Sequence, residues 1–236
     1  MAAPGEDNSD VWVVVRCYNE AEVVASVIRE LRACFVNIVG VDDGSTDGSG
    51  ELMRQAGARV VRHSVNLGAG AALQTGVEFA LLDPGAAYLV CFDADGQHRV
   101  SDAEAMVERA KAEDLDLLVG SRFLGTAPTG MPSSRKIVLR AGRIFERATT
   151  GIALTDAHNG LRVLSRRFAS TLSLTSPDMS YATELLEAAA RAQARYAEHP
   201  VQIRYSPYTL AKGERSINSV NIAFDVLVRA LLGRRR

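Results

Sequence analysis

Two aspartates that lie two positions apart are the sharpest sign of chemistry in the sequence. Asp93 and Asp95 directly follow residues 88–92, an apolar run typical of a buried strand. Residues i and i+2 of an extended chain project to the same side, so both carboxylates can address one cation. Mg²⁺ takes one or two carboxylates and completes its shell with substrate phosphates. The pair predicts a divalent-metal site, with a solvated turn that caps a helix as the alternative.

A second acidic group follows another apolar run. Asp42 and Asp43 open the segment 42–48, directly after residues 35–41. The spacing resembles the start of a calcium loop, but Arg54 stands where that loop needs a bidentate glutamate, so a calcium loop is excluded. Asp43 is therefore a candidate ligand-binding residue beside the predicted metal site.

A glycine-rich segment, residues 66–76, is the third candidate. It matches the dinucleotide-binding fingerprint only loosely, because Leu73 occupies the third glycine position. Such a segment at the start of a helix still lets a ligand approach closely and can bind anionic groups. Asn66 and Gly68 are therefore candidate ligand-binding residues, and a packing role is an equal alternative.

Basic residues of the second half of the chain form a fourth group. Most surface arginines are simply solvated, yet the planar guanidinium fork is well suited to phosphate. The candidates for an acceptor phosphate are Arg122, Arg135, Arg140 and Arg215.

The elements that must position these residues alternate along the first 120 residues. Ligands of open parallel sheets bind beyond the carboxyl ends of the strands, and each of the strands at 11–15, 35–41, 88–92 and 115–119 is followed by polar groups. The pattern predicts an α/β fold, a mostly parallel sheet flanked by helices. Strands are expected at 11–15, 35–41, 58–62, 88–92 and 115–119, and helices at 20–33, 47–56, 69–82 and 101–113.

The pattern changes after residue 120. We expect a long loop over 121–134, helices near 135–149 and 180–194, extended segments near 160–164 and 201–205, and an amphipathic helix over 217–232. The chain is interpreted as one domain. Its predicted divisions are a flexible N-terminus (1–10), a domain (11–216) with a nucleotide half (11–120) and an acceptor half (121–216), and a terminal helix with a basic tail (217–236).

Composition sets the class of protein. The chain has 236 residues, of which 47% are hydrophobic and 23% charged, as expected of an ordinary globular domain. A net charge of −1 argues against a nucleic-acid partner. No apolar run reaches the roughly 20 residues of a membrane helix, and no signal peptide is visible. Three cysteines without metal-type spacing suggest buried reduced thiols, so we expect a cytoplasmic protein.

The ordered motifs resemble family 2 glycosyltransferases of the GT-A fold, and among them the dolichyl- and polyprenyl-phosphate sugar transferases. The matching landmarks cover about residues 11–216: Tyr18-Asn19-Glu20, the segment 41–48, Asn66-Leu67-Gly68, Asp93-Ala94-Asp95-Gly96-Gln97, Gly120-Ser121-Arg122, the segment 155–162, Glu184 and the segment 213–216. Two departures are visible. Arg16-Cys17 stands where the family usually has proline before Tyr-Asn-Glu, and His158 to Arg162 replaces the common Ser-Gly-Phe-Arg.

The resemblance implies roles for individual residues. Tyr18, Glu20 and Asp43 would help to hold a UDP- or GDP-linked sugar, together with Asn66, Gly68 and Asp93. Asp93, Asp95 and Gln97 would place Mg²⁺ or Mn²⁺ and the diphosphate, which makes Asp95 a catalytic candidate. Arg122, Arg135, Arg140 and Arg215 would receive the acceptor phosphate, which makes Arg122 a catalytic candidate as well.

The implied reaction is inverting sugar transfer, with mannose or glucose as first candidates, to a polyprenyl phosphate. An acceptor phosphate is already an anion, whereas a hydroxyl acceptor needs a general base, for which Asp156 is the candidate. A saccharide acceptor and a nucleotide-sugar sensor without turnover stay open as alternatives. The helix expected at 217–232 either rests on an anionic membrane surface or serves as a packing or dimer helix.

Overall fold

The computed structural model describes residues 8–124, 151–176 and 180–204. Its strands are β1 (Val11–Cys17), β2 (Asn37–Asp42), β3 (Arg59–Arg62), β4 (Tyr88–Asp93), β5 (Leu117–Ser121), β6 (Arg162–Ser165) and β7 (Tyr196–Pro200). Its helices are α1 (Val24–Arg32), α2 (Ser49–Gln55), α3 (Ala69–Leu81), α4 (Val100–Ala112), α6 (Arg166–Ala169) and α7 (Tyr181–Arg191).

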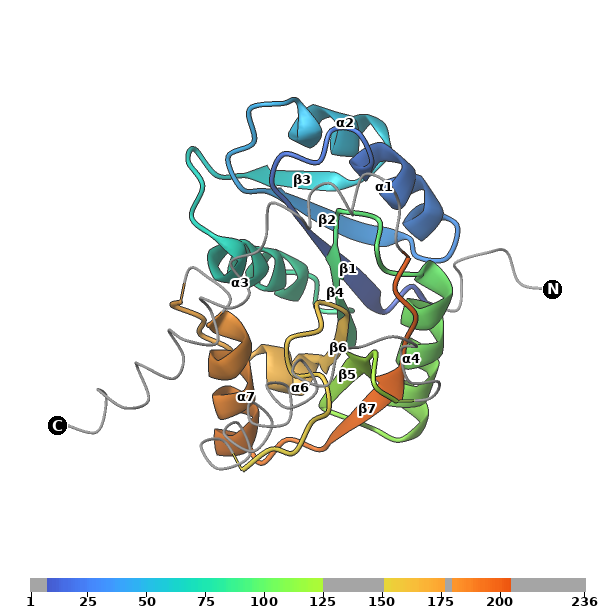
Figure 1. The fold of residues 1–236 in the computed structure, drawn as a ribbon, viewed down its shortest axis with the longest axis vertical. Coiled ribbons are helices and arrows are strands. Elements are labelled where there is room, and N and C mark those ends of the chain that lie inside the picture. Colours follow the sequence, from blue (N-terminus) through green and yellow to red (C-terminus); the bar gives the residue numbers. More distant parts are fainter. Residues whose placement is uncertain (1–7, 125–150, 177–179, 205–236) are drawn as a thin grey trace, which may run out of the picture.

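These strands form one mostly parallel sheet in the order β3-β2-β1-β4-β6-β5-β7 (Figure 1). Strand β6 lies antiparallel between β4 and β5, and the remaining strand pairs are parallel. The carboxyl ends of β1, β2 and β4 therefore meet at one edge, where the polar segments that follow them come together.

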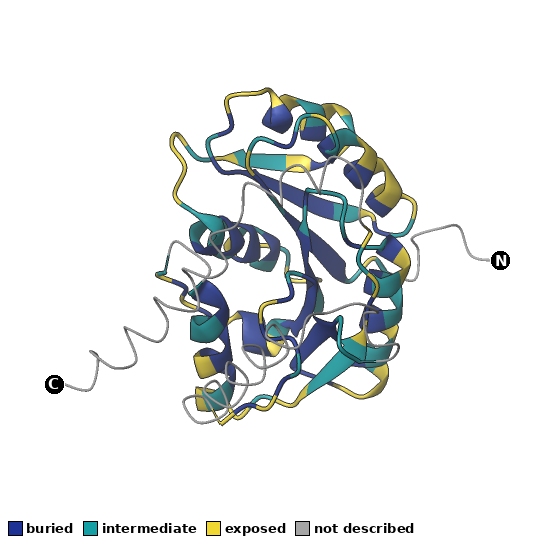
Figure 2. Ribbon diagram, in the orientation of Figure 1, coloured by how far each residue is buried: buried dark blue, intermediate teal, exposed yellow. Residues whose placement is uncertain are grey.

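Each face of the sheet carries its own apolar core. Val11, Val13 and Val15 pack with α1 and α4, whereas Trp12 and Val14 pack on the opposite face with α3 and α7. Because both faces are covered, β1 is an apolar run from Val11 to Val15, and Figure 2 shows that the central strands are buried.

The structure confirms the predicted mostly parallel α/β sheet and the nine elements expected in the first 120 residues. The expected strand at 160–164 is β6, and the expected helix at 180–194 is α7. Two of the three cysteines, Cys17 and Cys91, are buried, Cys34 is half-buried, and all three are free thiols.

One predicted segment is displaced. An extended segment was expected near 201–205, whereas the strand of this region is β7, which ends at Pro200, and no strand is assigned to 201–204. Strand β7 is an edge strand whose side chains are exposed or half-buried, so it lacks the apolar pattern that marks a core strand. The buried Val201 beyond it supplied the misleading signal.

Several predictions lie outside the described residues: most of the loop 121–134, the helix at 135–149, and the terminal helix and tail at 217–236. Within the ranges that are described, no helix has the length and hydropathy needed to span a bilayer.

Candidate active site

A pocket of about 340 Å³ opens at the carboxyl edge of β1, β2 and β4. Seven residues predicted from the sequence line it: Tyr18, Glu20, Asp43, Asn66, Gly68, Asp93 and Asp95. The structure adds lining residues that sequence analysis did not assign to the site, chiefly Arg16, His158, Gly160 and Tyr181. The motifs of the first half thus share one cavity with residues of the second half.

The turns after β1 and β2 hold each other in place. Asn19 has a positive φ of 54°, and its side-chain oxygen accepts a hydrogen bond from the amide of Thr46 at 2.9 Å. The amide of Asn19 donates to Oγ of Ser45 at 3.0 Å, and that of Glu20 donates to Oγ of Ser49 at 2.8 Å. The bond to the Glu20 amide satisfies a buried backbone group, and together the three bonds position Tyr18 and Glu20 at the pocket.

Asp43 orders the segment that leads into α3. Its carboxylate accepts hydrogen bonds from the amides of Leu67 and Gly68, both at 2.8 Å. Nδ1 of His63 lies 2.7 Å from the same carboxylate, and Nε2 of His63 lies 2.9 Å from Oγ1 of Thr75. Asp43 therefore fixes one wall of the pocket while still lining it.

Asp93 pairs with a cation of the protein itself. Arg16 of β1 forms an ion pair with Oδ1 of Asp93, and Nε2 of His98 lies 3.2 Å from Oδ2. Asp95 is held by its neighbour, since the amide of Gln97 donates to Oδ1 of Asp95 at 3.0 Å. The Asp-x-Asp pair is thus anchored before any substrate arrives.

The two carboxylates of the pair differ in their acidity. Burial by itself would raise the pKa of Asp93, but Arg16 and His98 outweigh it and hold that pKa far below its usual range. Burial, followed by the nearby charge of Asp93, raises the pKa of Asp95. Asp95 is consequently the carboxylate that gains more from a positively charged ligand.

The donor set fits a divalent metal that is shared with a substrate. Asp93 and Asp95 offer hard oxygen ligands and line the same cavity. Across the described residues, no three His, Cys, Asp or Glu side chains converge into a complete metal cage. Mg²⁺ sites that use one or two carboxylates plus substrate phosphates need no such cage. Gln97, predicted as a third ligand, does not line the cavity.

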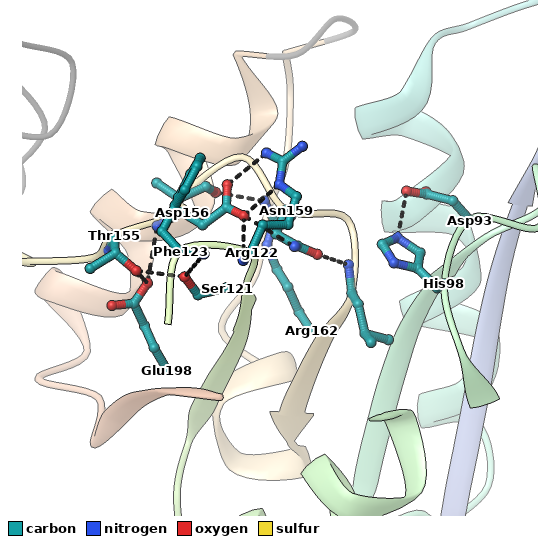
Figure 3. Close-up of polar contacts among 12 residues, drawn as sticks. Asp93, His98, Ser121, Arg122, Phe123, Thr155, Asp156, Asn159, Arg162 and Glu198 are labelled. Atoms are coloured by element: carbon teal, nitrogen blue, oxygen red, sulfur yellow. Dashed lines mark hydrogen bonds and ion pairs between the residues drawn. The ribbon is translucent and has the colours of Figure 1, made fainter. Parts of the chain in front are cut away.

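Arg122 and Asp156 face each other in a separate cluster (Figure 3). Nε and Nη2 of Arg122 donate to the two oxygens of Asp156, both at 2.7 Å, and the Arg122 amide adds a bond of 3.0 Å. Nδ2 of Asn159 lies 3.2 Å from Oδ2 of Asp156. Glu198 of β7 accepts hydrogen bonds from the amides of Thr155 and Asp156, which fixes this loop. Neither Arg122 nor Asp156 lines the pocket.

Replacement of Asp156 by Asn is expected to destabilise the protein in a pH-dependent way. Burial would raise the pKa of Asp156, but Arg122 and Asn159 outweigh it and lower that pKa below 3.8. A carboxyl group whose pKa is lower in the folded than in the unfolded protein stabilises the fold at any pH above its unfolded-state pKa. That stabilisation is lost as the pH falls through its folded-state pKa. In urea unfolding, the free energy of unfolding of Asp156→Asn should be about 2 kcal/mol lower than that of wild type at pH 7. This difference should become smaller below about pH 4.

The matched control is Asp114→Asn, because the Asp114 side chain is 65% exposed in its pair with Arg195. An exposed pair contributes about 0.5 kcal/mol or less. If the difference in free energy of unfolding between Asp156→Asn and wild type stays constant down to pH 3, the lowered pKa of Asp156 is contradicted.

Sequence reasoning missed Arg16 and Tyr181 for an identifiable reason. Arg16 was noted only as a departure from the family motif and Tyr181 only as part of a predicted helix, and the contact between them joins positions 165 apart in the chain. The signal in the sequence was Arg16-Cys17 where the family usually has proline before Tyr-Asn-Glu. Three predicted phosphate-binding residues, Arg135, Arg140 and Arg215, lie outside the described residues.

Two relatives align with most of the chain. The UDP-N-acetylglucosamine–dolichyl-phosphate N-acetylglucosaminyltransferase of Methanococcus voltae is 27% identical, over 94% of this chain and 95% of its own. The polyprenol monophosphomannose synthase of Mycolicibacterium smegmatis is 29% identical, over 74% of this chain and 71% of its own.

The fold has a close counterpart among solved structures. Glucosyl-3-phosphoglycerate synthase of Mycobacterium tuberculosis, crystallised with Mn²⁺ and UDP-glucose, superimposes with a TM-score of 0.68 at 18% identity, covering 97% of this chain and 80% of its own. This likeness identifies the architecture as the GT-A fold. The family model of glycosyl transferase family 2 matches residues 12–172. The chain belongs to glycosyl transferase family 2.

Proposed function

We propose that this glycosyltransferase moves a sugar from a nucleotide diphosphate sugar to a polyprenyl phosphate, with inversion at the anomeric carbon and with a divalent metal. The observation that carries the proposal is the single cavity in which Tyr18, Glu20, Asp43, Asn66 and the Asp-x-Asp pair converge. Such a cavity combines a wall for a nucleoside with carboxylates for a metal–diphosphate complex.

In this proposal each lining residue acts on the donor. Tyr18 is 45% exposed at the mouth of the pocket, where its ring offers an apolar surface to a base. Asp43 and Glu20 accept hydrogen bonds from the nucleoside. Asp93 and Asp95 would hold Mg²⁺ or Mn²⁺, which when bound neutralises the charge of the departing diphosphate. Gly68 lets the donor approach the start of α3.

The state of Asp156 favours a phosphate acceptor over a hydroxyl. Both of its oxygens accept hydrogen bonds from Arg122, and its pKa is lowered, so it is a weak proton acceptor. It also lies outside the lining of the pocket. A phosphate oxygen attacks as an anion and needs no such base. Relatives named for dolichyl-phosphate and polyprenol substrates point the same way.

The test is a transfer assay with separate donors and acceptors. Purified protein would receive Mn²⁺ or Mg²⁺, labelled UDP-N-acetylglucosamine, UDP-glucose or GDP-mannose, and either polyprenyl phosphate, the matching polyprenol alcohol, or 3-phosphoglycerate. We expect label in the organic extract only when the acceptor is polyprenyl phosphate. We also expect EDTA to abolish this transfer.

Other outcomes are equally informative. Label transferred to the free alcohol would overturn the argument from Asp156, and label on 3-phosphoglycerate would replace the lipid by a soluble phosphate acceptor. Tight donor binding without turnover for any acceptor would favour the nucleotide-sugar sensor.

A further inference from the structure

Arg16 and Asp93 are neighbours across the sheet. They are register partners on the parallel strands β1 and β4, so their side chains lie on the same face. Trp12 and Val14 precede Arg16 on that face and belong to an apolar core. Arg16 therefore places a positive charge where the strand pattern would continue with an apolar residue.

The contacts of Arg16 hold it at the base of the pocket. Its Nη2 pairs with Asp93, its Nη1 donates to the hydroxyl of Tyr181 at 2.6 Å, and its guanidinium lies 5.0 Å from the centre of the Tyr181 ring. The Arg16 side chain is only 9% exposed, and its Nε has no hydrogen-bond partner within the described structure. Arg16 and Tyr181 both line the cavity.

Basic and acidic side chains both surround Asp93. Arg162 of β6 is buried and stacks on the same Tyr181 ring at 5.4 Å, and His98 contacts the other oxygen of Asp93. The carboxylates of Glu20, Asp43 and Asp95 line the same pocket. A buried cation is weak evidence for a role in stability, because desolvation offsets much of the attraction. Its position beside a predicted metal ligand suggests a role in the site.

We propose that Arg16 is an internal cation of the donor site: it competes with the divalent metal for Asp93 and supplies positive charge to the donor diphosphate. This inference rests on the proposed function, since it concerns the same Asp-x-Asp pair. Arg16 would thereby lower the affinity of the empty site for metal and make the affinity for the nucleotide diphosphate less dependent on metal.

The two effects have opposite signs when the charge is removed. A positive charge in contact with one oxygen of Asp93 repels an incoming divalent cation, whereas it attracts a diphosphate. Water and salt reach the pocket and limit both effects. Arg16→Met should therefore bind Mn²⁺ about tenfold more tightly and bind UDP or GDP in EDTA about fivefold more weakly.

The experiment measures each affinity without an acceptor or a sugar. Electron paramagnetic resonance would follow Mn²⁺ binding to nucleotide-free protein, and calorimetry would follow UDP and GDP binding in EDTA. Wild type, Arg16→Met and the charge-conserving Arg16→Lys would be compared, with Arg16→Lys expected near wild type. Arg59→Met is the matched control, because it removes one positive charge from an exposed position that stacks on Trp12.

Each outcome decides the inference. Tighter Mn²⁺ binding together with weaker diphosphate binding in Arg16→Met supports it. Unchanged or weaker Mn²⁺ binding in Arg16→Met would show that Arg16 does not compete with the metal for Asp93. Unchanged diphosphate binding would show that Arg16 does not attract the donor diphosphate. If Arg59→Met changes the Mn²⁺ and diphosphate affinities by the same factors as Arg16→Met, both effects come from the net charge of the protein and not from the position of Arg16. No Mn²⁺ binding in either wild type or Arg16→Met would contradict the metal of the proposed function, whereas a failed lipid assay would leave these readouts intact.

Discussion

Replacement of Asp95 by Asn is expected to reduce sugar transfer about 1,000-fold without weakening the fold. Asp95 lines the pocket, and its amide replacement keeps the shape while losing the charge that would hold a metal. Loss of charge stabilisation at a departing group typically has an effect of this size. Steady-state kinetics with the best donor, and Mn²⁺ titration by paramagnetic resonance, measure it.

Thermal unfolding separates this effect from damage to the fold. Burial and the nearby charge of Asp93 raise the pKa of Asp95, so the ionised carboxylate is unfavourable in the folded protein at neutral pH. Asp95→Asn should therefore unfold at the wild-type temperature or slightly above it. Asp114→Asn makes the same chemical change at an exposed position before β5 and should keep full activity. Activity of Asp95→Asn above a tenth of wild type would contradict the assigned role.

Replacement of Gly160 by Ala is expected to lower kcat/KM about 100-fold, because a methyl group would displace the Asp93 carboxylate. A β-carbon on Gly160 would collide with Oδ2 of Asp93 and lie 3.1 Å from Nε2 of His98. The Asp93 side chain is 31% exposed, so it can rotate instead of breaking the fold. A displacement of about 1 Å at a catalytic centre has an effect of this order.

The control for Gly160→Ala is Gly85→Ala, where the nearest atom to a new methyl group is Oδ1 of Asp83 at 3.2 Å, before β4 and away from the pocket. Mn²⁺ affinity should fall in Gly160→Ala and stay constant in Gly85→Ala. If Gly160→Ala keeps both its Mn²⁺ affinity and its kcat/KM, the loop after Asp156 does not constrain Asp93.

The sequence by itself determined the alternation of strands and helices in the first half and seven of the residues that line the pocket. Parallel strands bring their carboxyl ends to one edge, so motifs that follow separate strands must meet there. Tyr18, Asp43 and Asp93 were predictable for this reason, Asn66 was predicted from the glycine-rich segment, and all four line the cavity. The edge strand β7 was not predictable, because its half-exposed side chains carry no apolar pattern.

Only the tertiary structure decided which charges meet. The pairing of Arg16 with Asp93 depends on β1 lying beside β4, and its bond to Tyr181 depends on α7 packing on the same face. The pairing of Arg122 with Asp156 turns two candidate reactive groups into one neutralised pair. Local sequence fixes residue type and spacing along an element, whereas the partner of a charge is set by strand order and packing between distant segments.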